Sequence, residues 1–127
     1  MALKDDSFPG SAAFDTISTA FASDETEREN AIKAGGAVYS FTLVNKDGKQ
    51  ESWYMDLKKE GKVGKGAAPT GGKPDVSIRL ADETFASIVS GQAQAKSLFM
   101  RGKIKVKGNF IKATKLDSIL GQTKAKL

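Results

Sequence analysis

The chain contains no cysteine and no histidine among its 127 residues. Without cysteine it forms no disulfide, and zinc sites built from cysteine and histidine are excluded. The thiol nucleophile and the most common general base near neutral pH are missing as well. Catalysis would have to rest on isolated carboxylates such as Asp56 or Asp117. We therefore expect a protein that is not an enzyme and that holds no cofactor and no metal.

Long apolar runs are also missing. No stretch approaches the roughly 18 consecutive apolar residues of a membrane-spanning helix, so we expect no such helix. The start of the chain, Met1 to Asp6, lacks a basic region followed by an apolar run, so it is not expected to be a secretory signal. The length is typical of one domain.

Acidic and basic residues are separated along the chain. Residues 1–57 contain five basic and ten acidic residues, whereas residues 58–127 contain fifteen basic and five acidic residues. The second half is therefore suited to approach an anionic surface such as a membrane. The plainer interpretation, that the lysines keep the protein soluble, stays open at this point.

Hydrophobic spacing predicts two helices and then a hairpin. The first helix covers 11–22, where Phe14, Ile17 and Phe21 share one face and Ser11 is the expected cap. Asp24 begins the second helix and a glycine pair ends it. The period then changes from helical to alternating, which predicts two half-buried strands around a turn. The expected ranges are strands 38–43 and 52–57, joined by the turn 45–49.

The remaining elements complete an α+β pattern. Asp82 is expected to cap a helix that contains Phe85. The predicted segments, in order, are a short strand at 62–66, a strand at 75–80, a helix at 82–91, a helical turn at 92–99, a strand at 101–108 and a last helix capped by Asn109. This order indicates one domain with a mostly antiparallel sheet that helices cover on one face.

The glycine-rich loop 64–73 invites comparison with a phosphate-binding loop. That motif needs a glycine, four further residues and then Gly-Lys-Ser/Thr, but here Gly66 is followed by Gly71, Gly72 and Lys73. Pro74 also prevents a helix from starting with a free N–H at that point. We interpret the segment as a surface loop.

Three lysines alternate along the last predicted strand. Lys103, Lys105 and Lys107 point one way, and Ile104 and Val106 point the other. Lysines on a strand protect a sheet edge and keep it soluble, and they also suit contact with a membrane surface. A nucleic-acid interface would place aromatic residues on the lysine face, and none is there. A basic module that binds anionic membranes or nucleic acid without an internal ligand is the alternative hypothesis for this chain.

The sequence ends in Ala125-Lys126-Leu127, a conservative form of the Ser-Lys-Leu peroxisomal address. The polar residues 121–124 before it form a suitable flexible stem. A frayed terminus without a role is the alternative. We expect import into the peroxisomal matrix, with the import receptor as a partner.

The apolar sets do not by themselves distinguish a packed core from a lined tunnel. A resemblance goes further. The run Leu98-Phe99-Met100-x-Gly102-Lys103-Ile104-Lys105-Val106-Lys107-Gly108-Asn109, with Ala113, Lys115 and Leu116 after it, resembles the sterol carrier protein 2 family, the non-specific lipid-transfer proteins. Residues 52–58 and 75–91 are similar to the same family. The likeness extends from about Phe14 to Leu127 and is greatest to short stand-alone fungal members.

The resemblance implies a five-stranded sheet covered by about five helices that enclose an apolar tunnel. Residues 1–124 would form the lipid-binding domain and residues 125–127 the targeting tripeptide. The implied ligands are fatty acids, fatty acyl-CoA, phospholipids and sterols, bound by a monomer that does not bind nucleic acid. The implied lining is Phe14, Ile17, Phe21, Trp53, Met55, Phe85, Leu98, Phe99, Met100, Ile104, Phe110 and Ile119. Lys96, Arg101 and Lys103 would meet the ligand's headgroup at the mouth, with Lys96 favouring carboxylates and CoA phosphates.

Overall fold

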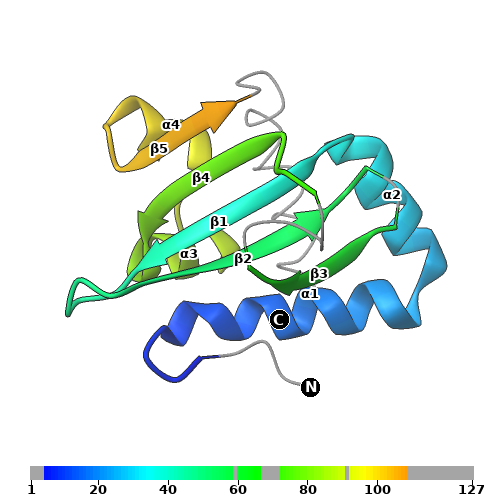
Figure 1. Ribbon diagram of the computed structural model, residues 1–127, viewed down its shortest axis with the longest axis horizontal. Coiled ribbons are helices and arrows are strands. Elements are labelled where there is room, and N and C mark those ends of the chain that lie inside the picture. Colours follow the sequence, from blue (N-terminus) through cyan, green and yellow to red (C-terminus); the bar gives the residue numbers. More distant parts are fainter. Residues whose placement is uncertain (1–4, 59, 67–71, 91, 109–127) are drawn as a thin grey trace.

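The computed structural model describes residues 5–58, 60–66, 72–90 and 92–108, without the side chains of Ala95 and Lys96 (Figure 1). The predicted last helix from Asn109 and the predicted C-terminal tripeptide lie outside these ranges. The described elements, in order, are η1 (Pro9–Ser11), α1 (Ala12–Ser23), α2 (Glu25–Gly35), β1 (Val38–Val44), β2 (Gln50–Asp56), β3 (Lys62–Lys65), β4 (Val76–Ala81), α3 (Asp82–Val89), α4 (Ala95–Met100) and β5 (Ile104–Gly108).

The strands form one sheet in the order β3-β2-β1-β4-β5. β1 and β2 are the predicted antiparallel hairpin, and β3 and β5 are antiparallel to their neighbours. β4 returns beside β1 and runs parallel to it. The expected α+β domain with a mostly antiparallel, five-stranded sheet is therefore confirmed. None of the described helices is both long enough and apolar enough to cross a bilayer.

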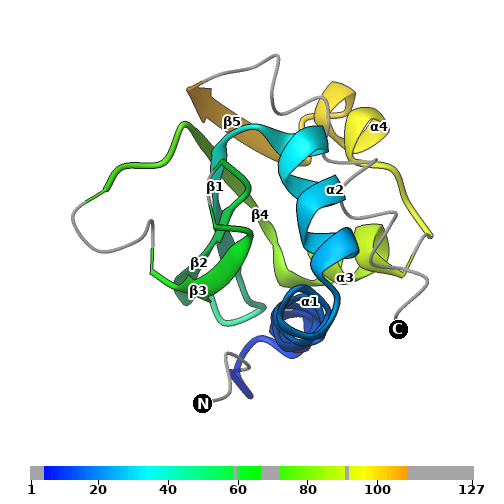
Figure 2. The same cartoon turned by 90° about the vertical axis from the view of Figure 1, so that its right-hand side faces the viewer.

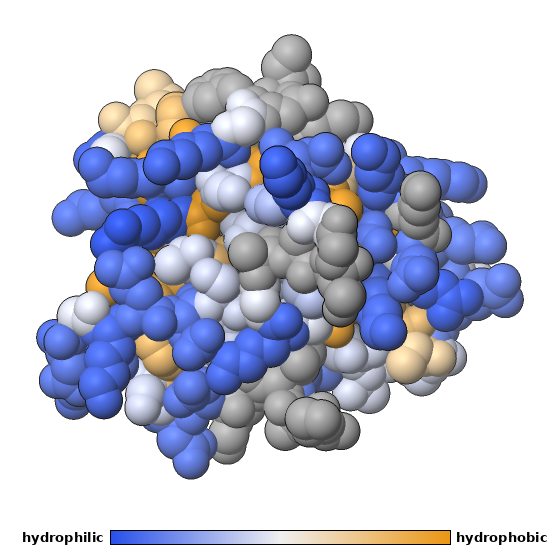
Figure 3. All heavy atoms as spheres, viewed as in Figure 1, coloured by the Kyte–Doolittle hydropathy of each residue, from blue (hydrophilic) through white to orange (hydrophobic). Residues whose placement is uncertain are grey.

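The four α-helices of the described ranges lie on one face of the sheet (Figure 2). Alternation along the strands separates two surfaces, as the sequence predicts. The inner face is apolar: Phe41 lies opposite Trp53 on β2 and Ile78 on β4, and all three are buried. The outer face, seen in Figure 3, has mostly hydrophilic and near-neutral side chains. Thr42 and Ser52 share a 2.8 Å hydrogen bond between their hydroxyls there.

Local capping confirms the prediction for Asp24 and corrects the one for Asp82, whereas Ser11 has the predicted N-cap position without a cap hydrogen bond. The Asp24 carboxylate accepts a 3.1 Å hydrogen bond from the Glu27 amide and so caps α2, as expected. Ser11 precedes α1, but its hydroxyl bonds the backbone of Asp5 and makes no cap hydrogen bond. Asp82 is inside α3 and is not its cap; its carboxylate accepts from the Gly10 amide at 2.9 Å. Both polar side chains fasten the N-terminal segment, which local spacing alone does not predict.

Candidate functional site

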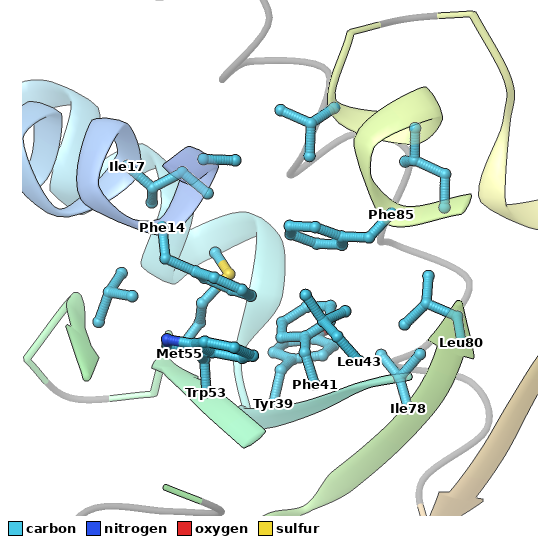
Figure 4. Close-up of a cluster of buried hydrophobic side chains, with 14 of the residues drawn as sticks. Phe14, Ile17, Tyr39, Phe41, Leu43, Trp53, Met55, Ile78, Leu80 and Phe85 are labelled. Carbon is cyan, nitrogen blue, oxygen red and sulfur yellow. The ribbon is translucent and has the colours of Figure 1, made fainter. Parts of the chain in front are cut away.

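The helices and the inner face of the sheet enclose an apolar layer, and aromatic rings occupy its centre (Figure 4). The Phe14 ring from α1 is stacked between Trp53 of β2, at a centroid distance of 5.2 Å, and Phe85 of α3, at 4.8 Å. Phe41 of β1 tilts against Phe14 and Phe85. We call Phe14, Phe41, Trp53 and Phe85 the aromatic stack. All four are almost completely buried.

Most residues predicted to line a tunnel lie in this layer. The buried members of the predicted set are Phe14, Ile17, Phe21, Trp53, Met55, Phe85 and Ile104. Leu98 and Phe99 on α4 are partly buried and pack against the layer, whereas Met100 is 77% exposed and lies on the surface. Phe110 and Ile119 lie outside the described residues. The tunnel, and which of these residues line it, stay predictions.

Phe8 is a core residue that the sequence does not reveal. It is 3% exposed, and its ring meets Trp53 edge-on with the centroids 5.6 Å apart. Hydrogen bonds to distant residues fix the segment around Phe8: the Asn45 side chain donates to the Ser7 carbonyl, and the Gly10 amide donates to the Asp82 carboxylate. Phe8 precedes Pro9 and falls before the helical repeat begins, so no periodic signal marks it. It covers the N-terminal side of the aromatic stack.

A cleft of about 300 Å³ opens at the C-terminal end of α1. It is lined by Ser18, Phe21, Ala22, Arg28 and residues 60–63. Phe21 and Val63, both buried, connect its wall to the apolar layer. The Arg28 guanidinium donates a 3.1 Å hydrogen bond to the Phe21 carbonyl, which holds it at the rim of the cleft. A cation fixed beside an apolar interior suits the anionic end of an amphipathic molecule.

Arg101 and Lys103, which were predicted to meet a headgroup, are exposed at the turn between α4 and β5 and do not line this cleft. The side chain of Lys96 is outside the described residues, and the role of these three cations stays a prediction. Arg28 and Lys62 both line the cleft, from segments more than 30 residues apart in the sequence. No local motif marks that encounter, so only the fold reveals it.

The buried ionisable groups of the described ranges serve the fold. Burial, with the nearby Asp75 charge, raises the pKa of Tyr39 to about 12, and its hydroxyl donates to the Gly35 carbonyl. Burial raises the pKa of Asp82, and the hydrogen bond from the Gly10 amide opposes that rise. The Asp56 carboxylate accepts from the Lys58 amide at 3.0 Å. The described residues contain no group of acidic side chains placed to hold a metal ion.

Comparison with known proteins identifies the family of the chain. The model of the SCP-2 sterol transfer family matches residues 14–121, so the chain belongs to that family. It is 44% identical over 122 residues to the fatty acid-binding protein of Yarrowia lipolytica, covering 94% of this chain and 95% of that one. It is 42% identical over 121 residues to the oleate-induced peroxisomal protein POX18 of Candida maltosa, covering 94% and 92%.

The fold is shared with a solved structure. The apo form of sterol carrier protein 2 from Yarrowia lipolytica superposes with a TM-score of 0.89 at 42% identity, over 98% of each chain. The predicted membership of the sterol carrier protein 2 family is thereby confirmed.

Proposed function

We propose that the chain binds and carries fatty lipids, with fatty acids and fatty acyl-CoA as the first candidates and phospholipids and sterols as further ones. The observation that carries the proposal is that Phe21 and Val63 belong both to the apolar layer and to the lining of the cleft. Arg28 and Lys62 line the same cleft, together with Glu60. The name of the Yarrowia lipolytica relative, a fatty acid-binding protein, supports it. The ligand's chain would enter the layer and its acidic group would remain at the cleft.

The energetics suit a carrier. An acyl chain of about 16 carbons gains up to ~12 kcal/mol when its methylenes leave water, at about 0.8 kcal/mol each. Association costs of ~4–15 kcal/mol offset much of this gain, so burial of the acyl chain alone supports dissociation constants of about micromolar or weaker. A carrier needs that range because it must also release its ligand. We propose no catalytic step, and a monomer is sufficient for this role.

The delipidated protein is expected to take up a fluorescent fatty acid in a one-to-one ratio and to show quenching of Trp53, the single tryptophan. Arg28→Gln is expected to weaken fatty-acid binding about tenfold, because it removes a charge-assisted contact. The same substitution should lower the affinity for a fatty alcohol of equal chain length only a little, since the alcohol has no carboxylate. Lys33→Gln removes an exposed cation on the same helix and is the matched control.

Different results would contradict the carrier function and the role of Arg28. A saturable assay with no acyl uptake by the native protein would contradict the carrier function. Equal weakening of acid and alcohol binding by Arg28→Gln would assign that residue to packing and leave the carrier function standing. Mass spectrometry of the intact protein as purified from cells gives an independent readout, because bound fatty acid would appear as added mass.

We further propose that the chain works in the peroxisomal matrix. The C-terminal Ala125-Lys126-Leu127 supports this, as does the name of the Candida maltosa relative, an oleate-induced peroxisomal protein. Removal of Leu127 from a protein tagged at its N-terminus is expected to move it from peroxisomes to the cytosol without changing acyl binding. Lys124→Ala should leave import intact. Continued import without Leu127 would refute the role of the tripeptide.

A further inference from the structure

A glycine at the cleft lies directly against the Arg28 side chain. Gly61, in the segment between β2 and β3, is buried and lines the same cleft as Arg28. Figure 1 shows α2, which carries Arg28, beside the start of β3. A Cβ at Gly61 would overlap the Arg28 Cγ, and it would lie 2.9 Å from the Arg28 Cδ and 3.2 Å from the Ile32 Cδ1. The aliphatic stem of Arg28 therefore rests on a backbone that only glycine leaves open.

The backbone conformation gives a second, separate reason for glycine at this position. Gly61 has φ at 63°, in the left-handed region that is unfavourable for a residue with a Cβ. Gly48 in the β1–β2 turn has the same requirement, with φ at 83°, but a Cβ there would meet nothing within 4 Å. The two glycines differ in the contact with a side chain, so Gly48 is the natural reference for Gly61.

The head of the Arg28 side chain is held by α1. Its guanidinium donates the 3.1 Å hydrogen bond to the Phe21 carbonyl. Phe21 lies in the last turn of α1, where the helix carbonyls have no partner within the helix and attract a cation. Arg28 is thus fixed at two points, with its stem on Gly61 and its head on α1. We call these two contacts the Arg28 clasp.

The clasp holds Arg28 without neutralising its charge. None of the ion pairs between described residues includes Arg28. The bond to Phe21 uses a single N–H of the guanidinium, which carries further donors suited to paired contacts with a carboxylate. Glu60, next to Gly61 in the sequence, also lines the cleft, so a guanidinium released from the clasp has a competing carboxylate close by in the chain.

We propose that Gly61 is a positioning residue for the acidic end of the ligand. By letting Arg28 lie on its backbone, Gly61 keeps the guanidinium at the rim of the cleft and away from Glu60. The cleft then favours an acid over an uncharged lipid of equal chain length. This inference rests on the proposed carrier function and adds to it the backbone position that decides the selectivity.

Gly61→Ala tests the proposal through the affinities for a fatty acid and for the fatty alcohol of equal chain length. The added Cβ displaces the stem of Arg28, so the dissociation constant of the acid is expected to rise about five- to tenfold. That of the alcohol should change less than about twofold, since the alcohol does not use the guanidinium. Gly48→Ala is the matched control and should leave the ratio of the two affinities unchanged.

Gly61→Asn covers the case in which the alanine variant does not fold. Asparagine adopts the left-handed conformation more readily than alanine, yet it carries the same Cβ. It is therefore expected to lose the preference for the acid as Gly61→Ala does, with a smaller loss of stability. An unchanged preference in both Gly61 variants would overturn the proposal.

A double-mutant cycle separates positioning from a purely structural role. The glutamine of Arg28→Gln keeps a Cγ, so the overlap with an added Cβ remains while the guanidinium is gone. In that background, Gly61→Ala is expected to change the dissociation constant of the acid less than about twofold, although it lowers the urea midpoint as it does with Arg28 present. Weakening of acid binding by the same factor in both backgrounds would assign Gly61 to folding alone and overturn the proposal.

The clasp is also measurable without a ligand. Side-chain NMR of Arg28 is expected to show slow rotation about the Nε–Cζ bond in the native and Gly48→Ala proteins, and fast rotation in Gly61→Ala. Fast rotation in the native protein would overturn the clasp even where acyl uptake is normal. Absence of acyl uptake by a native protein with slow rotation would instead contradict the carrier function, and with it the role of the clasp in selecting a ligand.

Discussion

Phe14→Ala is expected to lower the free energy of unfolding by about 4 kcal/mol, because it removes the central ring of the aromatic stack. Phe14 is fully buried and lies nearly parallel to Trp53 on one side, at 11°, and to Phe85 on the other, at 15°. Truncation leaves a cavity between helix and sheet and removes aromatic contacts worth about 0.5–1.5 kcal/mol for each pair. Urea unfolding, followed by far-UV circular dichroism and by Trp53 fluorescence, measures the loss.

The control for this variant lies on the opposite face of the same helix. Thr19 is exposed, so Thr19→Ala is expected to change the free energy of unfolding by less than about 0.5 kcal/mol. A loss of less than about 1.5 kcal/mol for Phe14→Ala would show that the layer collapses easily around the missing ring, and that the stack does not hold α1 on the sheet.

The aromatic stack complicates the use of substitutions to identify residues that bind lipid. The residues predicted to line a tunnel are also the ones that hold the helices on the sheet, as Phe14 and Trp53 show. A substitution there changes stability and affinity together, so loss of binding alone does not identify a lining residue. The cleft residue Arg28 avoids this difficulty because its predicted effect depends on the ligand's acidic group.

Local patterns predicted the elements well where one physical signal dominates. Alternation placed Tyr39, Phe41 and Trp53 on the buried face, because a strand with one face on the core exposes every second residue. The side chain of Asp24 was predicted to cap α2 from spacing alone, since capping is decided within one helical turn. Lys105 and Lys107 on β5 are exposed as predicted, whereas Lys103, also exposed, lies in the turn before the strand.

Such local patterns do not predict contacts between distant segments. The parallel pairing of β4 with β1, and the position of Arg28 and Lys62 at one cleft, depend on how distant parts of the chain fold together. Asp82 illustrates the same limit: its position suggested a helix cap, yet its partner is Gly10, 72 residues away. The expectation of an apolar tunnel came from the family resemblance and not from periodicity.

Gly108→Ala is expected to cost about 3–4 kcal/mol of unfolding free energy, and it gives a physical reason for a glycine within the run that resembles the family. Gly108 ends β5 with φ at 93°, a conformation that costs about 1–2 kcal/mol for a residue with a Cβ. A Cβ at this position would also overlap the Asp75 backbone carbonyl. That backbone cannot easily yield, because the Asp75 amide donates to the Val38 carbonyl at 2.9 Å.

Gly48→Ala separates the two contributions. Gly48 in the β1–β2 turn has φ at 83°, and a Cβ there would meet nothing within 4 Å, so only the conformational cost of about 1–2 kcal/mol applies. Urea unfolding should therefore give Gly108→Ala a free energy of unfolding about 2 kcal/mol lower than that of Gly48→Ala. Equal losses would show that the approach of β5 to Asp75 adds no constraint.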